Sequence, residues 1–149
     1  LFNCPVIRMI PNAPSIINQG YNPITFSENF DDEIKEQMKN CLACLGVLPE
    51  VEESKLEAYA IITGMGPAYF WFQINALYDL GVSFGLDESE TAQAITDMIK
   101  GTVDTLFNSG LLPEQVMDLI PVKPLSEYED QIISYFGYSL NKLYVKLKS

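Results

Sequence analysis

The sequence has 149 residues, which is room for about one domain that buries roughly two-thirds of the surface its unfolded chain exposes. Nine Lys and Arg residues against 20 Asp and Glu residues give a net charge of −11, which argues against nucleic acid as a partner. The sequence contains no His, which excludes a Ser-His-Asp triad, a Cys-His pair and any His-ligated metal site supplied by this chain.

Residues 1–26 hold four prolines, and we expect this segment to be extended or loop-like because proline removes hydrogen-bond donors from a strand. The apolar run from Val6 to Ile10 predicts a short strand with no partner strand nearby. This run lies close to the first residue, which is Leu1 and not Met. We therefore expect the chain to be a piece of a longer protein.

From Asp31 onward the apolar residues recur at helical spacing, which predicts an all-α region. The predicted helices span about 31–45, 54–64, 67–80 and 88–109, with a last helix from 126 onward. Glycines and prolines punctuate them, and three pairs have the spacing of a capping box. These pairs are Ser54 with Glu57, Asp87 with Glu90, and Ser126 with Glu129.

Three cysteines are too few, and odd in number, for a disulfide framework, which favours a reducing, cytoplasmic location. The sequence shows neither a signal peptide nor a run long enough to span a membrane. Cys41 and Cys44 form a Cys-x-x-Cys pair near a predicted helix C-terminus, where the helix dipole opposes a thiolate. We expect both to be buried small side chains and predict no metal site. The acidic clusters at 31–33 and 50–53 are predicted to be solvated helix caps.

The aromatic residues 69–72 point in every direction around the predicted helix. One small domain cannot easily bury all four, so we expect a second subunit to cover part of them. Just before them, the segment Thr63-Gly64-Met65-Gly66-Pro67-Ala68-Tyr69 places two glycines ahead of a buried helix. They would let the backbone pass close to another group and offer N–H groups to an anion or a carbonyl oxygen. A plain kink between two helices explains the glycines equally well.

This glycine segment resembles the C-terminal half of the pyrroline-5-carboxylate reductase family. Further matching segments are Ala76-Leu77, Asp79-Leu80-Gly81-Val82, Gly85-Leu86 and Gly101. The stretch from Val6 to Pro14 also resembles the Arg-x-Met-Pro-Asn-Thr-Pro segment of that family, so the resemblance covers residues 5 to about 112. It implies an α-helical dimerisation domain at 27–149, like the C-terminal domain of 6-phosphogluconate dehydrogenase. Residues 1–26 would then be the last strands of a truncated Rossmann domain.

The resemblance implies an NADP-dependent oxidoreductase that reduces the imine 1-pyrroline-5-carboxylate to L-proline and works as a homodimer. The Gly-x-Gly-x-x-Gly loop of the family is absent from this sequence, so we expect the chain alone to be inactive. Carried over by position, the cofactor contacts would be Asn12, Gly64, Met65, Gly66 and Pro67. The resemblance identifies no catalytic residue.

Two departures from the family pattern affect the expected site. Met65 stands where the family usually has Ser, which replaces a hydroxyl with a thioether. Residues 121–127 replace a Ser-Pro-Gly-Gly-Thr-Thr loop that holds the substrate carboxylate, and Pro121 and Pro124 remove donors there. Lys123 can substitute as a point charge and Ser126 as a donor, although Ser126 is equally suited to cap the last helix. A dimeric binding or regulatory protein with altered catalysis, or a dehydrogenase with another substrate, therefore stay open as alternatives.

Overall fold

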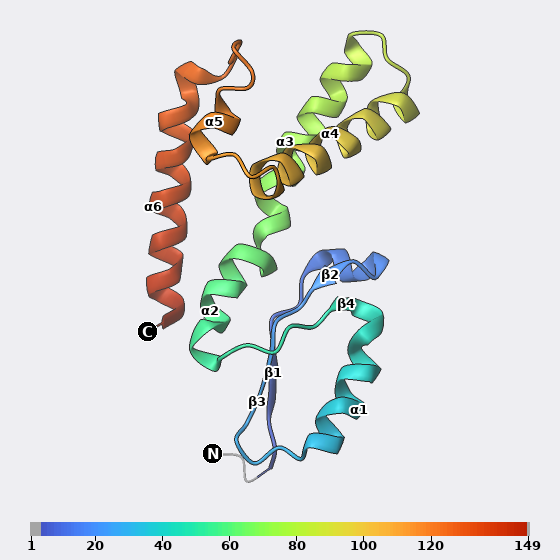
Figure 1. Ribbon diagram of the computed structural model, residues 1–149, viewed down its shortest axis with the longest axis vertical. Helices are drawn as coiled ribbons and strands as arrows, with labels where there is room; N and C mark the ends of the chain where they lie inside the picture. The colour runs from blue at the N-terminus through green and yellow to red at the C-terminus, as the bar shows by residue number, and fades with distance from the viewer. Residues whose placement is uncertain (1–3, 149) are drawn as a thin grey trace. The chain divides into compact units, whose positions relative to one another are not determined.

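The computed structural model describes residues 4–148 (Figure 1). These residues form two compact units. The first unit comprises residues up to 70 and residues from 136 onward, and the second unit comprises residues 71–135. Helices α3 and α6 contribute residues to both units. No helix within residues 4–148 is both long enough and apolar enough to cross a membrane.

The first unit contains two small strand pairs. Strand β1 (Ile7–Met9) pairs antiparallel with β3 (Ile24–Phe26), and β2 (Gly20–Tyr21) pairs parallel with β4 (Gly46–Val47). The prediction that the first strand has no partner nearby is therefore wrong. The prolines between β1 and β3 do not prevent pairing, because Pro14 lies in a 3-10 turn over Ala13–Ile17 that helps to reverse the chain.

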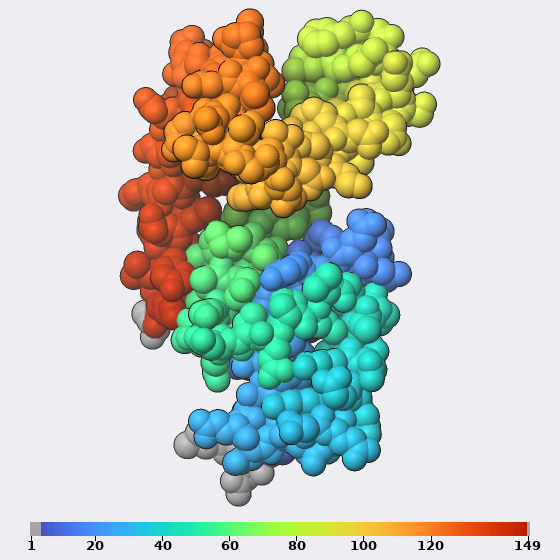
Figure 2. Space-filling view, in the orientation of Figure 1, coloured from blue at the N-terminus to red at the C-terminus, as the bar shows by residue number. Residues whose placement is uncertain are grey.

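Helix α1 (Asp32–Leu42) lies between β3 and β4 and confirms the helix predicted near 31–45. Asp31 caps it, because its carboxylate accepts hydrogen bonds from the N–H groups of Glu33 and Ile34 at 2.9 and 3.0 Å. A 3-10 turn over Ala43–Leu45 leads into β4. In Figure 2 the cyan and teal segment that contains α1 and β4 covers much of the blue N-terminal segment. Gly46 has a φ of 121°, and a Cβ there would overlap the backbone of Gly20, so β2 and β4 require glycine at this crossing.

Cys41 and Cys44 are exposed, which corrects the expectation that they are buried. The half-buried side of this helical segment consists of residues three and four apart in the chain, and neither cysteine belongs to it. These half-buried residues are Lys35, Met38, Lys39, Leu42 and Leu45. Within residues 4–148 no group of three or more His, Cys, Asp or Glu side chains is arranged to hold a metal ion.

After a 3-10 turn over Glu53–Lys55, the predicted helix near 54–64 consists of α2 (Leu56–Tyr59) and a π-helical turn over Ala60–Gly64. The capping box predicted for its start is wrong, because Ser54 makes no capping hydrogen bond there. The Glu57 carboxylate instead pairs with Arg8 and Lys148, at 3.4 and 3.7 Å. Helix α3 (Gly66–Ser83) follows.

In the second unit α3 and α4 (Glu88–Asn108) form a helical hairpin. The backbone N–H groups of Gly85 and Leu86 donate to the carbonyls of Val82 and Gly81, which is the Schellman pattern that ends a helix at a left-handed glycine. A Cβ on Gly81 would lie 2.6 Å from the Thr91 methyl group, so this glycine sets how closely the helices approach. Asp87 lies at the N-cap of α4 but makes no side-chain capping bond, so that predicted capping box is also wrong.

Helices α5 (Pro113–Met117) and α6 (Glu129–Lys148) complete the chain. Of residues 71–135, all of which the structure describes, only Thr91 is buried. Phe70, Trp71 and Phe72 are 54, 55 and 68% exposed, in agreement with the expectation that the chain alone does not bury the aromatic cluster. Much of the apolar surface of these helices is therefore open in a single chain.

The core of the first unit includes a polar residue, Asn22, whose side chain is fully buried. Its carbonyl oxygen accepts hydrogen bonds from the Asn12 N–H and the Ser15 hydroxyl, both at 3.0 Å. Its amide nitrogen donates to the Leu45 carbonyl at 3.3 Å. One side chain thus joins the end of the first strand segment, the 3-10 turn and the entry to β4, around the apolar residues Ile24, Leu56 and Ile61.

We predict that Asn22→Ala lowers the free energy of unfolding by about 3 kcal/mol, because it leaves several buried polar groups without a partner. The matched control is Asn40→Ala at an exposed position of α1, where we expect a change within about 0.5 kcal/mol. Urea unfolding of both variants measures the difference. Equal stability of the two variants would show that the Asn22 hydrogen bonds contribute no net stability.

Candidate functional site

Asn12 and the glycine segment at 63–67, which are far apart in the chain, meet in the first unit. The Asn12 amide nitrogen donates to the Thr63 carbonyl at 3.4 Å, and its carbonyl oxygen accepts from the Tyr21 N–H at 3.0 Å. These two hydrogen bonds hold both ends of the Asn12 side-chain amide. The Asn22 side chain holds the backbone N–H of Asn12 as well. One N–H and one lone pair of the Asn12 amide stay available to a ligand.

Gly64 lies close to the N-terminal segment. A Cβ there would lie 2.9 Å from the Ile10 side chain and 3.7 Å from the Pro11 carbonyl oxygen. The group expected to pass close to the glycine backbone is therefore the chain's own residue Ile10. The predicted contact of Gly64 with a cofactor stays a prediction.

The start of α3 offers few backbone donors. The N–H of Met65 donates to the Ala60 carbonyl, the N–H of Ala68 donates to the Met65 carbonyl, and Pro67 has none. Two N–H groups at this helix start thus bind carbonyl oxygens of the chain itself, and the predicted contact with an anion stays a prediction. Gly66 differs from Gly64, because no atom lies within 4 Å of the position its Cβ would occupy. Met65 and Pro67 are half-buried beside it.

Tyr69 fixes the direction in which α3 leaves this turn. Its hydroxyl donates to the Ile61 carbonyl at 2.8 Å, and its ring packs edge-on against Phe136 of α6 at 5.8 Å. Burial raises the pKa of Tyr69, so the hydroxyl stays protonated and keeps donating at neutral pH. The π-helical turn and α3 are thus connected by a side chain as well as by the backbone.

An ion cluster lies at the start of α2. Arg8 of β1 pairs with Glu53 and Glu57, and Lys148 of α6 pairs with Glu57 and donates to the Ser54 carbonyl at 2.8 Å. The pKa of Glu57 is lowered, first by a hydrogen bond from its own backbone N–H and then by Arg8 and Lys148. The pKa of Arg8 is raised, chiefly by its hydrogen bond to Glu53. All of these charges have partners, so the cluster holds elements together.

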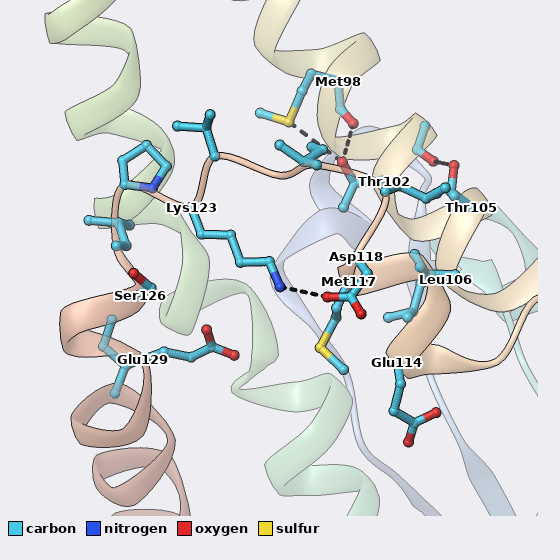
Figure 3. A pocket seen from close by; sticks show the side chains of 18 of the residues that line it. Met98, Thr102, Thr105, Leu106, Glu114, Met117, Asp118, Lys123, Ser126 and Glu129 are labelled. Atoms are coloured by element: carbon cyan, nitrogen blue, oxygen red, sulfur yellow. Dashed lines mark hydrogen bonds and ion pairs between the residues drawn. The ribbon is translucent and has the colours of Figure 1, made fainter.

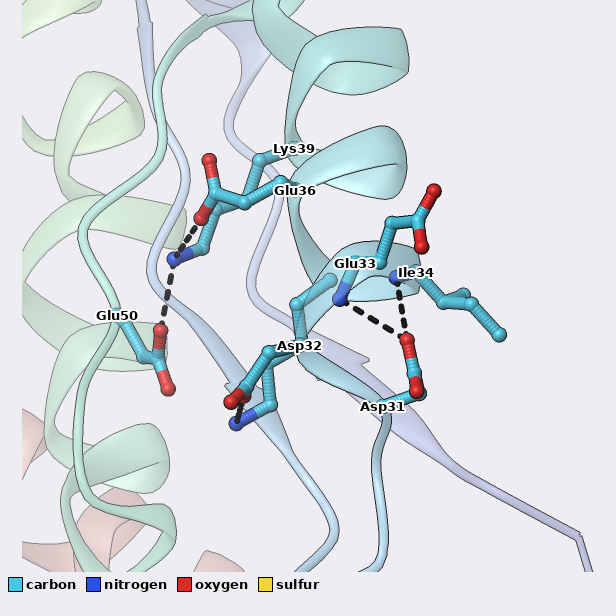
Figure 4. Close-up of polar contacts among 8 residues, drawn as sticks. Asp31, Asp32, Glu33, Ile34, Glu36, Lys39 and Glu50 are labelled. Carbon is cyan, nitrogen blue, oxygen red and sulfur yellow. Dashed lines mark hydrogen bonds and ion pairs between the residues drawn. The ribbon is translucent and has the colours of Figure 1, made fainter.

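The acidic groups predicted to be caps are engaged in local structure (Figure 4). Asp31 caps α1 as expected, whereas Glu50 pairs with Lys39 at 2.8 Å, and Glu36 with the same Lys39 at 3.4 Å. The pKa of Glu50 is lowered, first by the hydrogen bond from Lys39. These carboxylates balance basic and backbone groups nearby and form no ligand set for a metal.

Lys123 and Ser126, the predicted substrate residues, both line one pocket of about 1090 Å³ in the second unit (Figure 3). The pocket is an open one, lined by residues of α4, α5, the loop at 118–126 and the start of α6. The Lys123 ammonium pairs with the Asp118 carboxylate at 3.0 Å. Asp118 could not be predicted from the sequence as the partner of Lys123, because no spacing rule connects a residue at the end of one short helix to a lysine five positions later.

Ser126 does not cap the last helix, so that interpretation is wrong. A 3-10 turn over Ser126–Tyr128 precedes α6, and its capping position is Leu125. The Leu125 carbonyl accepts the Tyr128 N–H at 2.9 Å, and the Ser126 N–H donates to the Lys123 carbonyl at 3.1 Å. Among residues 4–148 the Ser126 hydroxyl has no hydrogen-bond partner, so it is free to donate into the pocket.

The pocket has a negative balance of charge. Lys123 is the one basic side chain among its lining residues, against the carboxylates of Asp97, Glu114, Asp118 and Glu129. Most of the other lining residues are apolar, among them Leu106, Ile132 and Ile133. An anion entering this pocket is attracted by Lys123 alone and repelled by the acidic residues around it.

Comparisons with known proteins agree on one family. Residues 53–123 match the family described as pyrroline-5-carboxylate reductase dimerisation. The protein named pyrroline-5-carboxylate reductase in Corynebacterium melassecola is 30% identical over 112 residues, which cover 75% of this chain and 42% of that protein. The protein of the same name in Staphylococcus aureus strain COL is 29% identical over 146 residues, covering 92% and 53%. The chain spans about half the length of the curated relatives it matches.

Solved structures share the fold. Plasmodium falciparum pyrroline carboxylate reductase, solved with NADP bound, superposes with a TM-score of 0.73 at 23% identity. That match covers 95% of this chain and 59% of the other. The enzyme from Streptococcus pyogenes gives 0.73 at 20% identity and covers 95% and 57%. Sequence and fold agree, and the chain belongs to the pyrroline-5-carboxylate reductase family, whose dimerisation domain it carries.

Proposed function

We propose that the chain forms the dimerisation and substrate-side part of an NADP-dependent reductase that converts 1-pyrroline-5-carboxylate to L-proline. The curated relatives carry the name of this activity, and the structure from Plasmodium falciparum holds NADP. The observation that carries the proposal is the meeting of Asn12 with the glycine segment at 63–67, the two motifs that identified the family.

The residues around Asn12 fit a nicotinamide cofactor in part. The Asn12 amide has one donor and one acceptor left, which matches the donor and acceptor of a carboxamide group. No atom lies within 4 Å of the position that a Cβ on Gly66 would occupy, and this buried glycine has the half-buried apolar residues Met65 and Pro67 as neighbours. When bound, NADPH supplies the hydride. The role of Asn12 in this proposal is to orient the carboxamide. Gly64, which has no Cβ, leaves room for the Ile10 side chain.

Lys123 and Ser126 are proposed to hold the substrate carboxylate. The side chain of Lys123 is 42% exposed, and its ammonium pairs with Asp118, whose side chain is 79% exposed. Such an exposed ion pair contributes little stability, so exchanging Asp118 for the substrate carboxylate costs little. The Ser126 hydroxyl has no partner to give up. These residues would replace the glycine-rich loop of the family with one charge and one hydroxyl.

The proposal includes a homodimer in a cytoplasmic, reducing location. The family model describes residues 53–123 as a dimerisation domain, and the helices of the second unit expose apolar side chains such as Phe84 and Phe107, at 79 and 76%. Covering these side chains is favourable by roughly 25 cal/mol for each Å² of apolar surface that is removed from water. We also propose that residues 1–26 end a nucleotide-binding domain and that the helical domain begins at residue 27.

The activity is tested with the full-length gene product that contains this sequence. We expect 1-pyrroline-5-carboxylate to cause oxidation of NADPH with formation of proline, followed by absorbance and by amino-acid analysis. A product that binds proline and NADPH without turnover would contradict the reductase proposal and favour a binding protein. Turnover of another cyclic imine but not of this one would contradict the assigned substrate.

Lys123→Ala is predicted to raise the KM for 1-pyrroline-5-carboxylate about tenfold, because one charge-assisted contact of about 1.4 kcal/mol is lost. Lys100→Ala is the matched control, since Lys100 lies on α4 and does not line the pocket. Asp118→Asn removes the competing carboxylate and is expected to lower the KM. Equal KM values for the two lysine variants would show that Lys123 does not bind the substrate.

A further inference from the structure

The Cys-x-x-Cys pair lies in the first unit and does not belong to the site proposed above. Cys41 lies in the last turn of α1, and Cys44 lies in the 3-10 turn that follows it. Both side chains are exposed, and both thiols are free. Free cysteine is among the residue types that proteins bury most often, so two exposed thiols three positions apart are an unusual feature of this surface.

Continuous helical backbone brings the two cysteines close together. Leu42 and Ala43, which separate them, both have right-handed helical dihedrals, with φ of −85 and −57°. Residues three positions apart have Cα atoms about 5 Å apart in an α-helix and about 6 Å apart in a 3-10 helix. Both distances fall within the roughly 4.4 to 6.8 Å that a disulfide spans between its Cα atoms. The backbone between Cys41 and Cys44 therefore does not have to unfold for a disulfide to form.

The Cys44 thiol is directed toward the turn that contains Cys41. Its sulfur lies 3.7 Å from the Cys41 carbonyl oxygen, so the S–H donates weakly to the backbone of the residue that it would join. Side chains in a helix lean toward the helix N-terminus, which places the later residue of such a pair over the earlier one. The Cys44 sulfur thus already lies on the side of Cys41.

Closing the bond requires a small local adjustment. Cβ atoms three residues apart on a helix are about 5–6 Å apart, whereas those of a disulfide are about 3.5–4.5 Å apart. This approach falls on the end of α1, where the backbone already changes from α to 3-10 geometry. An exposed disulfide that draws a turn together is easily reduced, which is typical of reversible disulfides. In a reducing location such a disulfide is transient.

We propose that Cys41 and Cys44 form a reversible dithiol–disulfide site, which a low-molecular-weight disulfide such as glutathione disulfide oxidises. One cysteine thiolate attacks glutathione disulfide, forms a mixed disulfide with one glutathione and releases the other. The second cysteine thiolate then attacks the cysteine sulfur of the mixed disulfide and releases the second glutathione. The protein loses two electrons and two thiol protons, and one glutathione disulfide becomes two glutathione thiols. This site goes beyond the proposed function and needs neither its cofactor nor its substrate.

The pair supplies proximity and not an activated thiol. The helix dipole opposes a thiolate at this end of α1, so it gives no assistance to the first attack. In the second attack the two sulfurs belong to one helical turn, so the attacking thiol has a far higher effective concentration than a thiol in solution. Cys4 is also exposed but has no cysteine three positions away. We therefore expect oxidation at Cys4 to stop at the mixed disulfide.

Peptide mapping of the full-length gene product that contains this sequence can follow each cysteine separately. Trypsin cleaves after Lys39 and Lys55, so Cys41 and Cys44 fall together in one peptide, 40–55, which holds no other cysteine. The reduced protein is incubated with glutathione disulfide, its remaining thiols are blocked with iodoacetamide, and the peptides are weighed without a reducing step.

The expected result differs between the pair and the single cysteine. The 40–55 peptide loses the mass of two hydrogen atoms and carries neither glutathione nor an alkyl group, whereas the peptide with Cys4 carries one glutathione. Treatment with dithiothreitol restores both thiols of the 40–55 peptide. A 40–55 peptide that carries glutathione without the loss of two hydrogens would overturn the proposal. Thiols of the pair that stay free while Cys4 is modified would overturn it as well.

Single variants separate the two steps. Cys44→Ser keeps the first attack and removes the second, so we expect glutathione on Cys41 to rise at least about tenfold above its level in the unaltered protein. Cys4→Ser is the matched control and is expected to leave the oxidation of the 40–55 peptide unchanged. Equal glutathione on Cys41 in the Cys44→Ser variant and in the unaltered protein would show that Cys44 does not resolve the mixed disulfide.

Discussion

The buried Asn22 amide is the interaction on which the first unit depends. Local preferences in this part of the chain are weak, because each of the strands β1 to β4 has only two or three residues. A single amide that is fully enclosed and hydrogen-bonded to three segments defines one arrangement of them. Any other pairing leaves polar groups buried without partners, which is far more costly than the loss of one short strand contact. The Asn22 side chain also positions Asn12, because it accepts a hydrogen bond from the Asn12 backbone N–H. The Asn12 side chain in turn donates to the Thr63 carbonyl of the glycine segment.

The second unit follows a different principle. It has hydrogen-bonded helices, a glycine-ended hairpin and one closely packed contact between Gly81 and Thr91, but only that threonine is buried in it. Its secondary structure is therefore specified within the chain, and much of its apolar surface is left for contacts with something else. A family whose model is named for dimerisation provides the natural explanation, since association buries the surface that folding of one chain leaves open.

Helices could be predicted from the sequence because their determinants are local. The 3.6-residue period and Asp31 as a cap were enough for α1, and glycines predicted the ends near residues 46 and 64. The capping box failed at Ser54 because Glu57 binds Arg8 and Lys148. It failed at Ser126 because a local 3-10 turn, in which the Leu125 carbonyl accepts from Tyr128, precedes the helix. The partner of the first strand was missed because pairing at a distance leaves no local pattern. The structure places Asn12 against Thr63, but the contact with a cofactor that the family motifs imply stays a prediction. The pairing of Lys123 with Asp118 could be found only in the structure.

Positive charge is scarce in this protein. With a net charge of −11, this protein has few cations to bind an anionic substrate, and three of its nine lie within its last eight residues. Those three share α6 with acidic residues at its start, so the helix is bipolar. Lys123 is left as the single cation of a pocket with four carboxylates. In the proposed function a carboxylate ligand therefore binds there through short-range contacts with Lys123 and Ser126, because the long-range field of the pocket repels it. Recognition in such a pocket depends on short-range geometry more than on electrostatic attraction, and residues 121–127 set that geometry.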